Sequence, residues 1–410
     1  MFLAGALKVD DEEKPPIDPW ETYGAQGAII LYVLRLLTLL TLPQVIFNFA
    51  GLLLFNAFPG KVKLKGSPLL APFICIRVVT RGDFPQLVRD NVTRNMNLCI
   101  DVGMENFMIE VVTDKVINLP KHARVREVVV PSEYKTKSGA LFKSRALQYC
   151  LEDGVNMLSD TDWIVHLDEE TLLTENSVRG ILNFVFDGQY QFGQGLITYA
   201  NEHVVNWLTT LADSFRVSDD MGKLRFQFYV IHKPLFSWKG SYVVTQVGAE
   251  RKVSFDNGLD GSVAEDCYFA MKAYVEGYSF NFIEGEMWEK SPFTLWDFMQ
   301  QRKRWLQVDK KVITDLGWPF PMKLHHLPLF VTGLVNSNVV ALISDDLREG
   351  RPTAALNEGN ISAVRLMVQT EKETYQQIRI SFGFGMSQVH QIFHEHLVVR
   401  KSCTLWIRYI

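Results

Sequence analysis

Three acidic residues that follow one short apolar run are the first candidates for chemistry. Asp168, Glu169 and Glu170 come directly after Trp163–Leu167. Neighbouring carboxylates repel one another unless a cation lies among them. Mg²⁺ or Mn²⁺ would suit this group, because these ions bind one or two carboxylates and take further oxygen ligands from substrate phosphates. The alternative is a solvated helix start, where the helix dipole favours acids.

Two further groups combine residue types that could act on a charged substrate. Glu265 and Asp266 open a helical pattern, and alone they would serve as helix-capping acids. The run Gln300–Trp305 places three consecutive cations before a tryptophan. These cations could bind a diphosphate and the tryptophan a sugar, or the run could form a solvated helix face.

The elements around these residues alternate between strand and helix patterns. Buried strands are expected at Phe73–Val79, Phe107–Thr113, Val125–Val130 and Trp163–Leu167, and helices at Phe84–Leu98 and Ser138–Glu152. Such alternation predicts an α/β fold with a mainly parallel sheet, whose ligands bind beyond the carboxyl ends of the strands. Asp114 and Asp168 both end predicted strands, although an acid at one strand end is by itself weak evidence.

Composition excludes several classes of protein. The 410 residues include 42 Lys and Arg against 46 Asp and Glu, for a net charge of −4, and 47% are hydrophobic. A disordered chain would be less apolar, and a nucleic-acid-binding protein would carry an excess of cations. The five cysteines include no Cys-x-x-Cys pair, which argues against a disulfide scaffold or a zinc ribbon.

An apolar stretch near the N-terminus predicts a membrane segment. Residues 25–58 are almost entirely apolar, and we expect one tilted membrane helix over Leu36–Phe58. A re-entrant hairpin broken at Pro43 and a buried pair of soluble helices are the alternatives. The lysines at positions 61, 63 and 65 follow this stretch, so the positive-inside rule places the rest of the chain in the cytosol.

The motifs, taken in order, resemble the family 2 inverting glycosyltransferases. Asp114, Asp168 and Asp266 match the three acids of that family, and Gln301 opens a Q(Q/R)xRW-like motif that includes Arg304 and Trp305. Lys137 lies in a turn like the lysine-rich turn of the family. The resemblance implies a GT-A-like nucleotide-sugar-binding domain together with membrane segments.

Longer stretches are similar to the Egghead-type β-1,4-mannosyltransferases of invertebrate glycosphingolipid synthesis. They are Phe73–Val88, Ser138–Glu152, Asp162–Thr171 and Ser291–Gln307, within a similarity that covers roughly residues 1–307. The resemblance implies a membrane-bound enzyme that transfers mannose from GDP-mannose to glucosylceramide. It also implies an endomembrane location, in the Golgi or endoplasmic reticulum.

The resemblance further assigns roles to individual residues. Asp266 would be the catalytic base, beside Glu265, while Asp168 and Glu170 would hold Mg²⁺ or Mn²⁺; the family more often has Asp at the position of Glu170. The nucleotide sugar would contact Asp114, Lys137, Asp168, Gln301, Arg302 and Arg304. Trp305 would contact the acceptor.

The chain is thus expected to divide into an acidic flank (1–24), a membrane segment (25–60), a catalytic domain (66–307) and a divergent tail (308–410). The tail is unlike the membrane helices of the family, since it carries charged runs such as Asp345–Glu349. Two other functions therefore remain open. One is a different family 2 enzyme of the polysaccharide synthase type, and the other is an inactive variant with a binding role.

Overall fold

The structure is a computed structural model. It describes residues 18–39, 42–56, 60–202, 204–236, 238–263, 265–303, 399–402 and 405–408. Arg304, Trp305, most of the acidic flank and most of the tail lie outside the described residues, so the predictions made for them stay predictions. The chain separates into two units, Met1–Phe330 and Val331–Ile410. In the second unit the described residues form an antiparallel pair, β8 (Val399–Ser402) and β9 (Leu405–Arg408).

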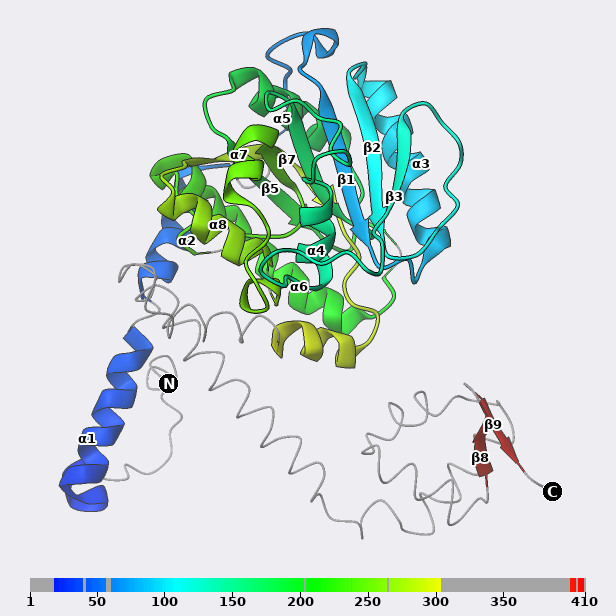
Figure 1. Ribbon diagram of the computed structural model, residues 1–410. Coiled ribbons are helices and arrows are strands. Elements are labelled where there is room, and N and C mark those ends of the chain that lie inside the picture. Colours follow the sequence, from blue (N-terminus) through cyan, green and yellow to red (C-terminus); the bar gives the residue numbers. More distant parts are fainter. Residues whose placement is uncertain are drawn as a thin grey trace. The chain divides into compact units, whose positions relative to one another are not determined.

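A seven-stranded sheet forms the centre of the first unit (Figure 1). The strands are β1 (Ile74–Thr80), β2 (Phe107–Thr113), β3 (Val125–Val129), β4 (Trp163–Asp168), β5 (Phe192–Thr198), β6 (Val243–Gln246) and β7 (Phe280–Trp288), in the order β3-β2-β1-β4-β6-β5-β7. All run parallel except β6, which is antiparallel to β4 and β5. The predicted mainly parallel sheet is confirmed, and its first four strands lie within one residue of their expected bounds.

Helices cover both faces of this sheet. The α-helices are α1 (Pro19–Leu39), α2 (Leu42–Leu54), α3 (Pro85–Val102), α4 (Phe142–Tyr149), α5 (Glu175–Asp187), α6 (Trp207–Asp219), α7 (Val247–Val253) and α8 (Glu265–Val275). Single turns of 3₁₀-helix form η1 (Pro68–Leu70) and η4 (Asp260–Ser262), and π-helical turns form η2 (Asp220–Leu224) and η3 (Gln227–Ile231). Because side chains alternate along a strand, Val111 of β2 packs in the cluster of α3 and α5, whereas Val112 packs with α4.

The helix predicted over Ser138–Glu152 is shorter than expected. It begins at Phe142, because the preceding backbone is held in a turn by side chains. The Ala140 amide donates to the Thr136 hydroxyl at 2.7 Å, and the Leu141 amide donates to the Ser262 hydroxyl at 2.8 Å. Gly139 has a φ of 79°, a conformation that suits glycine and is incompatible with a continuous helix.

The single helix expected over Leu36–Phe58 is wrong, since this stretch divides between α1 and α2. Pro43 lies in the first turn of α2, where a missing amide hydrogen costs nothing. One face of α2 docks on η2: the Lys223 amide donates to the Asn48 side chain at 3.1 Å, and Phe47 stacks on Phe226. Among the described residues, we find no helix whose length and apolarity together would allow it to span a bilayer.

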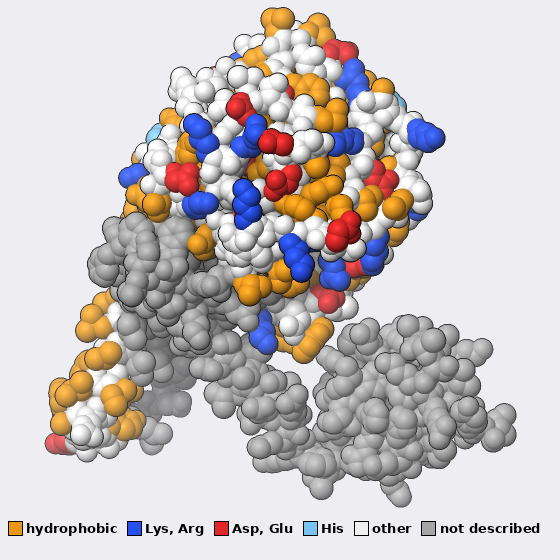
Figure 2. Space-filling model, viewed as in Figure 1, with side chains coloured by type: hydrophobic (Ala, Val, Ile, Leu, Met, Phe, Trp, Pro, Cys, Tyr) orange, Lys and Arg blue, Asp and Glu red, His pale blue; other side chains and the backbone are white. Residues whose placement is uncertain are grey.

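Charged side chains have two distinct arrangements in this unit. On the face drawn in Figure 2, basic and acidic side chains are interspersed. Inside the sheet, a buried row crosses neighbouring strands, where Arg77 of β1 pairs with Glu110 of β2 at 2.8 Å and with Glu250 of α7 at 3.4 Å. His166 of β4 contacts Glu250 at 2.6 Å. Paired charges of this kind are tolerated in a core because each one compensates another.

Candidate active site

The carboxyl ends of the parallel strands meet at one edge of the sheet, and the predicted acids gather there. Asp114 follows β2, and Asp168 ends β4. Because β6 runs the other way, the residues before it, Gly240 and Ser241, reach the same edge. The Asp168 amide donates to the Ser241 hydroxyl at 3.1 Å, which fixes the end of β4 against this loop.

Lys143 of α4 connects the acids, and sequence reasoning missed it. Its ammonium group donates to Asp168 Oδ1 and to the Gly240 carbonyl at 3.2 Å, and it lies 3.8 Å from Glu265 Oε1. Burial alone would lower the pKa of Lys143, but the carboxylates of Asp168 and Glu265 raise it, so the side chain stays charged. Lys143 thus places a positive charge between Asp168 and Glu265, and the predicted divalent metal stays a prediction. The sequence offered little signal, because a lone lysine in a helix is usually a solvated residue.

Asp266 lies in the first turn of α8, beside Glu265. The Cys267 amide donates to Asp266 Oδ1 at 2.7 Å. Burial, followed by the charge of Glu265, raises the pKa of Asp266 to about 7, against the lowering effect of Lys143. A Cβ added to Gly240 would lie 3.2 Å from Asp266 Oδ2, so this glycine permits the close approach of the loop. Asp168, Glu265 and Asp266 therefore lie together around Lys143, and the roles assigned to them stay predictions.

Glu169 and Glu170, next to Asp168, have different surroundings. Glu169 accepts a hydrogen bond from the Thr80 hydroxyl, although burial raises its pKa. The pKa of Glu170 is raised well above its usual value by burial and then by the charges of Glu289 and Asp168.

Carboxylate oxygens at this site could bind a divalent metal, but the described residues do not supply a complete set of ligands for one. Within the ranges that the structure describes, no group of three or more His, Cys, Asp or Glu side chains could hold a metal ion. Mg²⁺ commonly binds through one or two carboxylates and substrate phosphates, and Asp168 and Glu170 fit that mode of binding. Lys143 occupies one oxygen of Asp168, so the metal and this lysine would share the same carboxylate.

Asp114 and Lys137 lie apart from the central acids. Asp114 pairs with Arg145 of α4 at 2.7 Å, and almost half of its side chain is exposed. Lys137 is exposed in the turn before α4. Both positions are open to a ligand at the strand ends, but the proposed contacts with a nucleotide remain predictions.

The described part of the cationic motif belongs to a helix over residues 295–303. Gln301 is half-buried. Arg302 donates to Asp213 of α6 at 2.5 Å and lies over the Phe298 ring at 4.3 Å. Burial and the nearby Arg216 lower the pKa of Arg302 to about 10. Asp213 was not among the predicted site residues, and its side chain is only 2% exposed.

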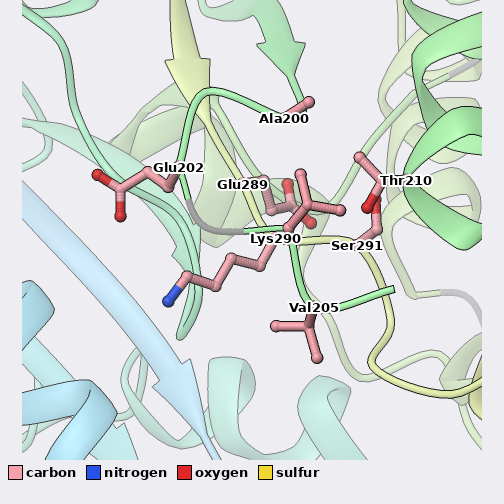
Figure 3. A pocket seen from close by; sticks show the side chains of 8 residues that line it. Ala200, Glu202, Val205, Thr210, Glu289, Lys290 and Ser291 are labelled. Carbon is pink, nitrogen blue, oxygen red and sulfur yellow. The ribbon is translucent and has the colours of Figure 1, made fainter. Parts of the chain in front are cut away.

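A pocket lies beyond the ends of β5 and β7, at the same edge of the sheet (Figure 3). It is lined by Ala200, Glu202, Val204, Val205, Thr210, Glu289, Lys290 and Ser291. Burial and then the charge of Asp168 raise the pKa of Glu289 to about 7, whereas Arg216 and Lys239 lower it. This pocket and the central acids therefore share one electrostatic environment.

Comparison with known proteins identifies similar chains. A family model described as glycosyl transferase family group 2 matches residues 163–356. The β-1,4-mannosyltransferase egh of Drosophila melanogaster is 74% identical over 322 residues, which make up 78% of this chain and 70% of that protein. The β-1,4-mannosyltransferase bre-3 of Caenorhabditis elegans is 66% identical over 306 residues, or 75% of this chain and 67% of that protein.

Among solved structures, the chain aligns with a mannosyltransferase of Pyrobaculum calidifontis in complex with GDP-Man and Mn²⁺. The TM-score is 0.45 and the identity 14%, over 88% of this chain and 99% of the other.

Proposed function

This chain belongs to the β-1,4-mannosyltransferase family that includes egh and bre-3, and we propose that it transfers mannose from GDP-mannose to glucosylceramide in glycosphingolipid synthesis. Family membership makes it a glycosyltransferase. The observation that carries the proposal is the group of Asp168, Glu265 and Asp266 around Lys143. An inverting transfer needs a base for the acceptor hydroxyl and positive charge near the departing diphosphate, and this group offers both.

Asp266 is the base in this proposal. It takes the proton from the attacking hydroxyl of the acceptor sugar, while the nucleotide diphosphate leaves from the opposite face of the anomeric carbon. A carboxyl whose pKa is raised to about 7 is well matched to this task near neutral pH. Lys143 limits how far that pKa rises, so a substantial fraction of Asp266 remains ionised.

The donor side depends on Asp168 and Glu170, which we propose hold Mg²⁺ or Mn²⁺ together with the donor's phosphates. The bound ion would neutralise charge on the leaving diphosphate. Lys143 lies close enough to Asp168 to add a second positive charge there. Asp114, Lys137 and Gln301 are proposed to contact the nucleotide sugar.

The exposed face of α6 supports a lipid acceptor and a membrane-surface location. Trp207, Leu211 and Phe215 recur every four residues on one face of this helix, and Trp207 and Phe215 are each 71% exposed. The polar Thr210 and Asp213 are buried on the other side. A helix that hides its polar side chains and exposes aromatic ones is suited to an apolar surface, such as a bilayer of the Golgi or endoplasmic reticulum.

The experiment that tests this function measures metal-dependent transfer of mannose to glucosylceramide, with competing nucleotide sugars and ceramide acceptors in parallel reactions. Asp266→Asn should lower kcat by about 10²- to 10⁴-fold, the usual contribution of a general base. Asp101→Asn, at an exposed position of α3, serves as the matched control. Equal activity of Asp266→Asn and the parent enzyme would contradict the assignment of Asp266 as the base.

A further inference from the structure

The polar face of α6 contacts the segment that leads into the cationic motif. Asn206, which caps α6, and Thr209 are three residues apart and so lie on one face of the helix. The Asn206 side chain donates to the Phe293 carbonyl at 3.3 Å, and the Thr209 hydroxyl donates to the Pro292 carbonyl at 2.8 Å. These contacts hold the start of the helix over residues 295–303, the motif helix, which lies beside α6 in Figure 1.

Asp213 continues the same face of α6 one turn later and holds the motif itself. Its side chain is almost completely buried. Oδ1 of Asp213 accepts a hydrogen bond from Arg302 at 2.5 Å and lies 3.9 Å from Nη1 of Arg216. One buried carboxylate oxygen is thus shared by two guanidinium groups, one from α6 and one from the motif helix.

Arg216 connects this group to the sheet. Its guanidinium donates to the Tyr199 hydroxyl at 2.5 Å and lies 5.6 Å from the centre of the Tyr199 ring. Tyr199 directly follows β5, at the edge of the sheet where the candidate site lies. The contacts therefore run from that edge through Arg216 and Asp213 to Arg302 of the motif.

Asp213 compensates two positive charges that would otherwise repel each other. Burial and then the charge of Arg216 lower the pKa of Arg302 to about 10, whereas Asp213 raises it. Removing the acid from a buried charge group leaves the remaining charges uncompensated. Without the carboxylate, Arg216 and Arg302 would push α6 and the motif helix apart.

We propose that Asp213 is a positioning residue for donor binding, which holds Arg302 and the neighbouring Gln301 at the edge of the sheet that carries the candidate site. The inference rests on the proposed function, in which Gln301 contacts the nucleotide sugar. Asp213 does not touch the substrate under this assignment. It acts through Arg302 on the placement of the motif helix.

The affinity for the donor tests this role directly. Asp213→Asn keeps the size of the side chain and removes its charge. In titration calorimetry with Mn²⁺ present, this variant of the full chain should bind GDP-mannose about 10- to 100-fold more weakly, because small displacements of a binding group are costly. Asp213→Glu, which restores the charge, should recover most of the affinity. Equal affinity of Asp213→Asn and the parent chain overturns the proposal.

Asp219→Asn is the matched control for these measurements. Asp219 lies in the same helix as Asp213, but about half of its side chain is exposed and it pairs with Lys223 at 3.0 Å. The substitution makes the same chemical change on the outer side of α6. Its affinity for GDP-mannose should equal that of the parent chain, and a loss as large as that of Asp213→Asn would mean that position 213 is not special.

A second substitution tests whether Asp213 acts through Arg302. Arg302→Gln alone should also weaken GDP-mannose binding. If the two residues form one unit, adding Asp213→Asn to this variant should weaken binding no further. Independent contributions would instead multiply the two effects on the dissociation constant. Multiplied effects would exclude the proposed route, because they would show that Asp213 influences the donor without Arg302.

Hydrogen exchange reports on the motif helix without any ligand. Amide hydrogens of residues 295–303 should exchange faster in Asp213→Asn than in the parent chain, while those of β1 and β4 keep the parent rate. Such a local change differs from a loss of the whole fold, which would raise exchange in the core strands as well. Faster exchange throughout the chain, or unchanged exchange in the motif helix, rejects the positioning role.

Mannose transfer separates this inference from the proposed function. A parent chain that binds GDP-mannose but transfers no mannose to glucosylceramide refutes the proposed reaction. In that case, weaker GDP-mannose binding in Asp213→Asn still supports the positioning role. Normal transfer by the parent chain, together with unchanged GDP-mannose binding in Asp213→Asn, rejects the inference alone.

Discussion

Asp266 has surroundings that tie its activity to pH. Burial and Glu265 raise its pKa to about 7, so half of it is protonated near neutrality. A base must be deprotonated to act, and we therefore expect kcat/KM to increase with pH through about 7 and then to level off. The measurement is the pH–rate profile of transfer at constant metal concentration. A profile that is flat between pH 5.5 and 8.5 would argue against Asp266 as the base.

Lys143 sets the position of that pH profile. Its positive charge favours the ionised form of Asp266, and so lowers the pKa of the aspartate. In Lys143→Met this effect is lost, and the rising limb of the profile should shift to higher pH. Lys135→Met, which removes an exposed charge of the same type, should leave the limb in place. A limb that stays unchanged in Lys143→Met would mean that this lysine does not act on the base.

Arg77 is predicted to matter for folding and not for chemistry. Its side chain is 1% exposed and compensates the buried acids Glu110 and Glu250. Removing one member of a buried charge group leaves the others uncompensated, so Arg77→Met should cost about 3–5 kcal/mol in the free energy of unfolding. Arg81→Met, one residue beyond the same strand, removes an 84% exposed side chain that pairs with Asp83 at the surface, and it should cost about 0.5 kcal/mol or less. Denaturant unfolding of both variants provides the comparison.

At the residue level, acids were easier to find from sequence than their partners. Asp168 and Asp266 stand out because carboxylates next to apolar runs are unusual. Lys143 and Asp213 carry no such signal, since each becomes important only through burial, and burial depends on segments far away in the chain. The contact between Lys143 and Asp168, for example, exists only because α4 packs on β1 and β2, and β4 pairs with β1 in the folded sheet.

At the level of elements, regular strands were predictable and irregular ones were not. The strands β1, β2 and β4 are mostly runs of β-branched and apolar residues, which is the pattern of a strand buried on both faces. The strand β5 instead contains two glycines, because aromatic rings pack against its backbone: a Cβ on Gly195 would lie 2.1 Å from the Tyr242 ring. Glycine weakens the strand signal in the sequence while making this packing possible.

The contact between α2 and η2 is another close approach of backbones. A Cβ added to Gly51 would lie 2.0 Å from the Gly222 carbonyl oxygen, so Gly51→Ala forces the two helices apart. Overpacking of this kind costs about 1–3 kcal/mol. We expect Gly51→Ala to unfold at a lower temperature than the parent chain, while Gly60→Ala, where the added atom meets nothing within 4 Å, should unfold at the parent temperature. Equal melting temperatures of the two variants would show that α2 does not depend on this contact.

At the scale of the whole molecule, composition alone could not decide the role of the N-terminal apolar stretch. An apolar run can be a membrane segment or a helix that docks on its own protein, and both have the same residue content. The contacts of Asn48 and Gly51 with η2, and the stacking of Phe47 on Phe226 shortly after it, decide how α2 is used in this fold. Those contacts required the π-helical turn at Asp220–Leu224, which has no recognisable sequence pattern.

The orientation of the catalytic unit gives the last prediction. The cytosolic location that we expect from the lysines after the apolar stretch predicts that the acceptor pattern Asn91-Val92-Thr93 carries no glycan. The fold gives an independent reason to expect Asn91 unmodified, since its amide donates to the Glu169 carbonyl at 2.8 Å. An unmodified Asn91 therefore does not identify the compartment, and a second acceptor is needed. Lys121→Asn with Ala123→Thr creates one in an exposed loop. Endoglycosidase treatment of this variant should leave its mobility unchanged, whereas a glycan at position 121 would place the unit in the lumen.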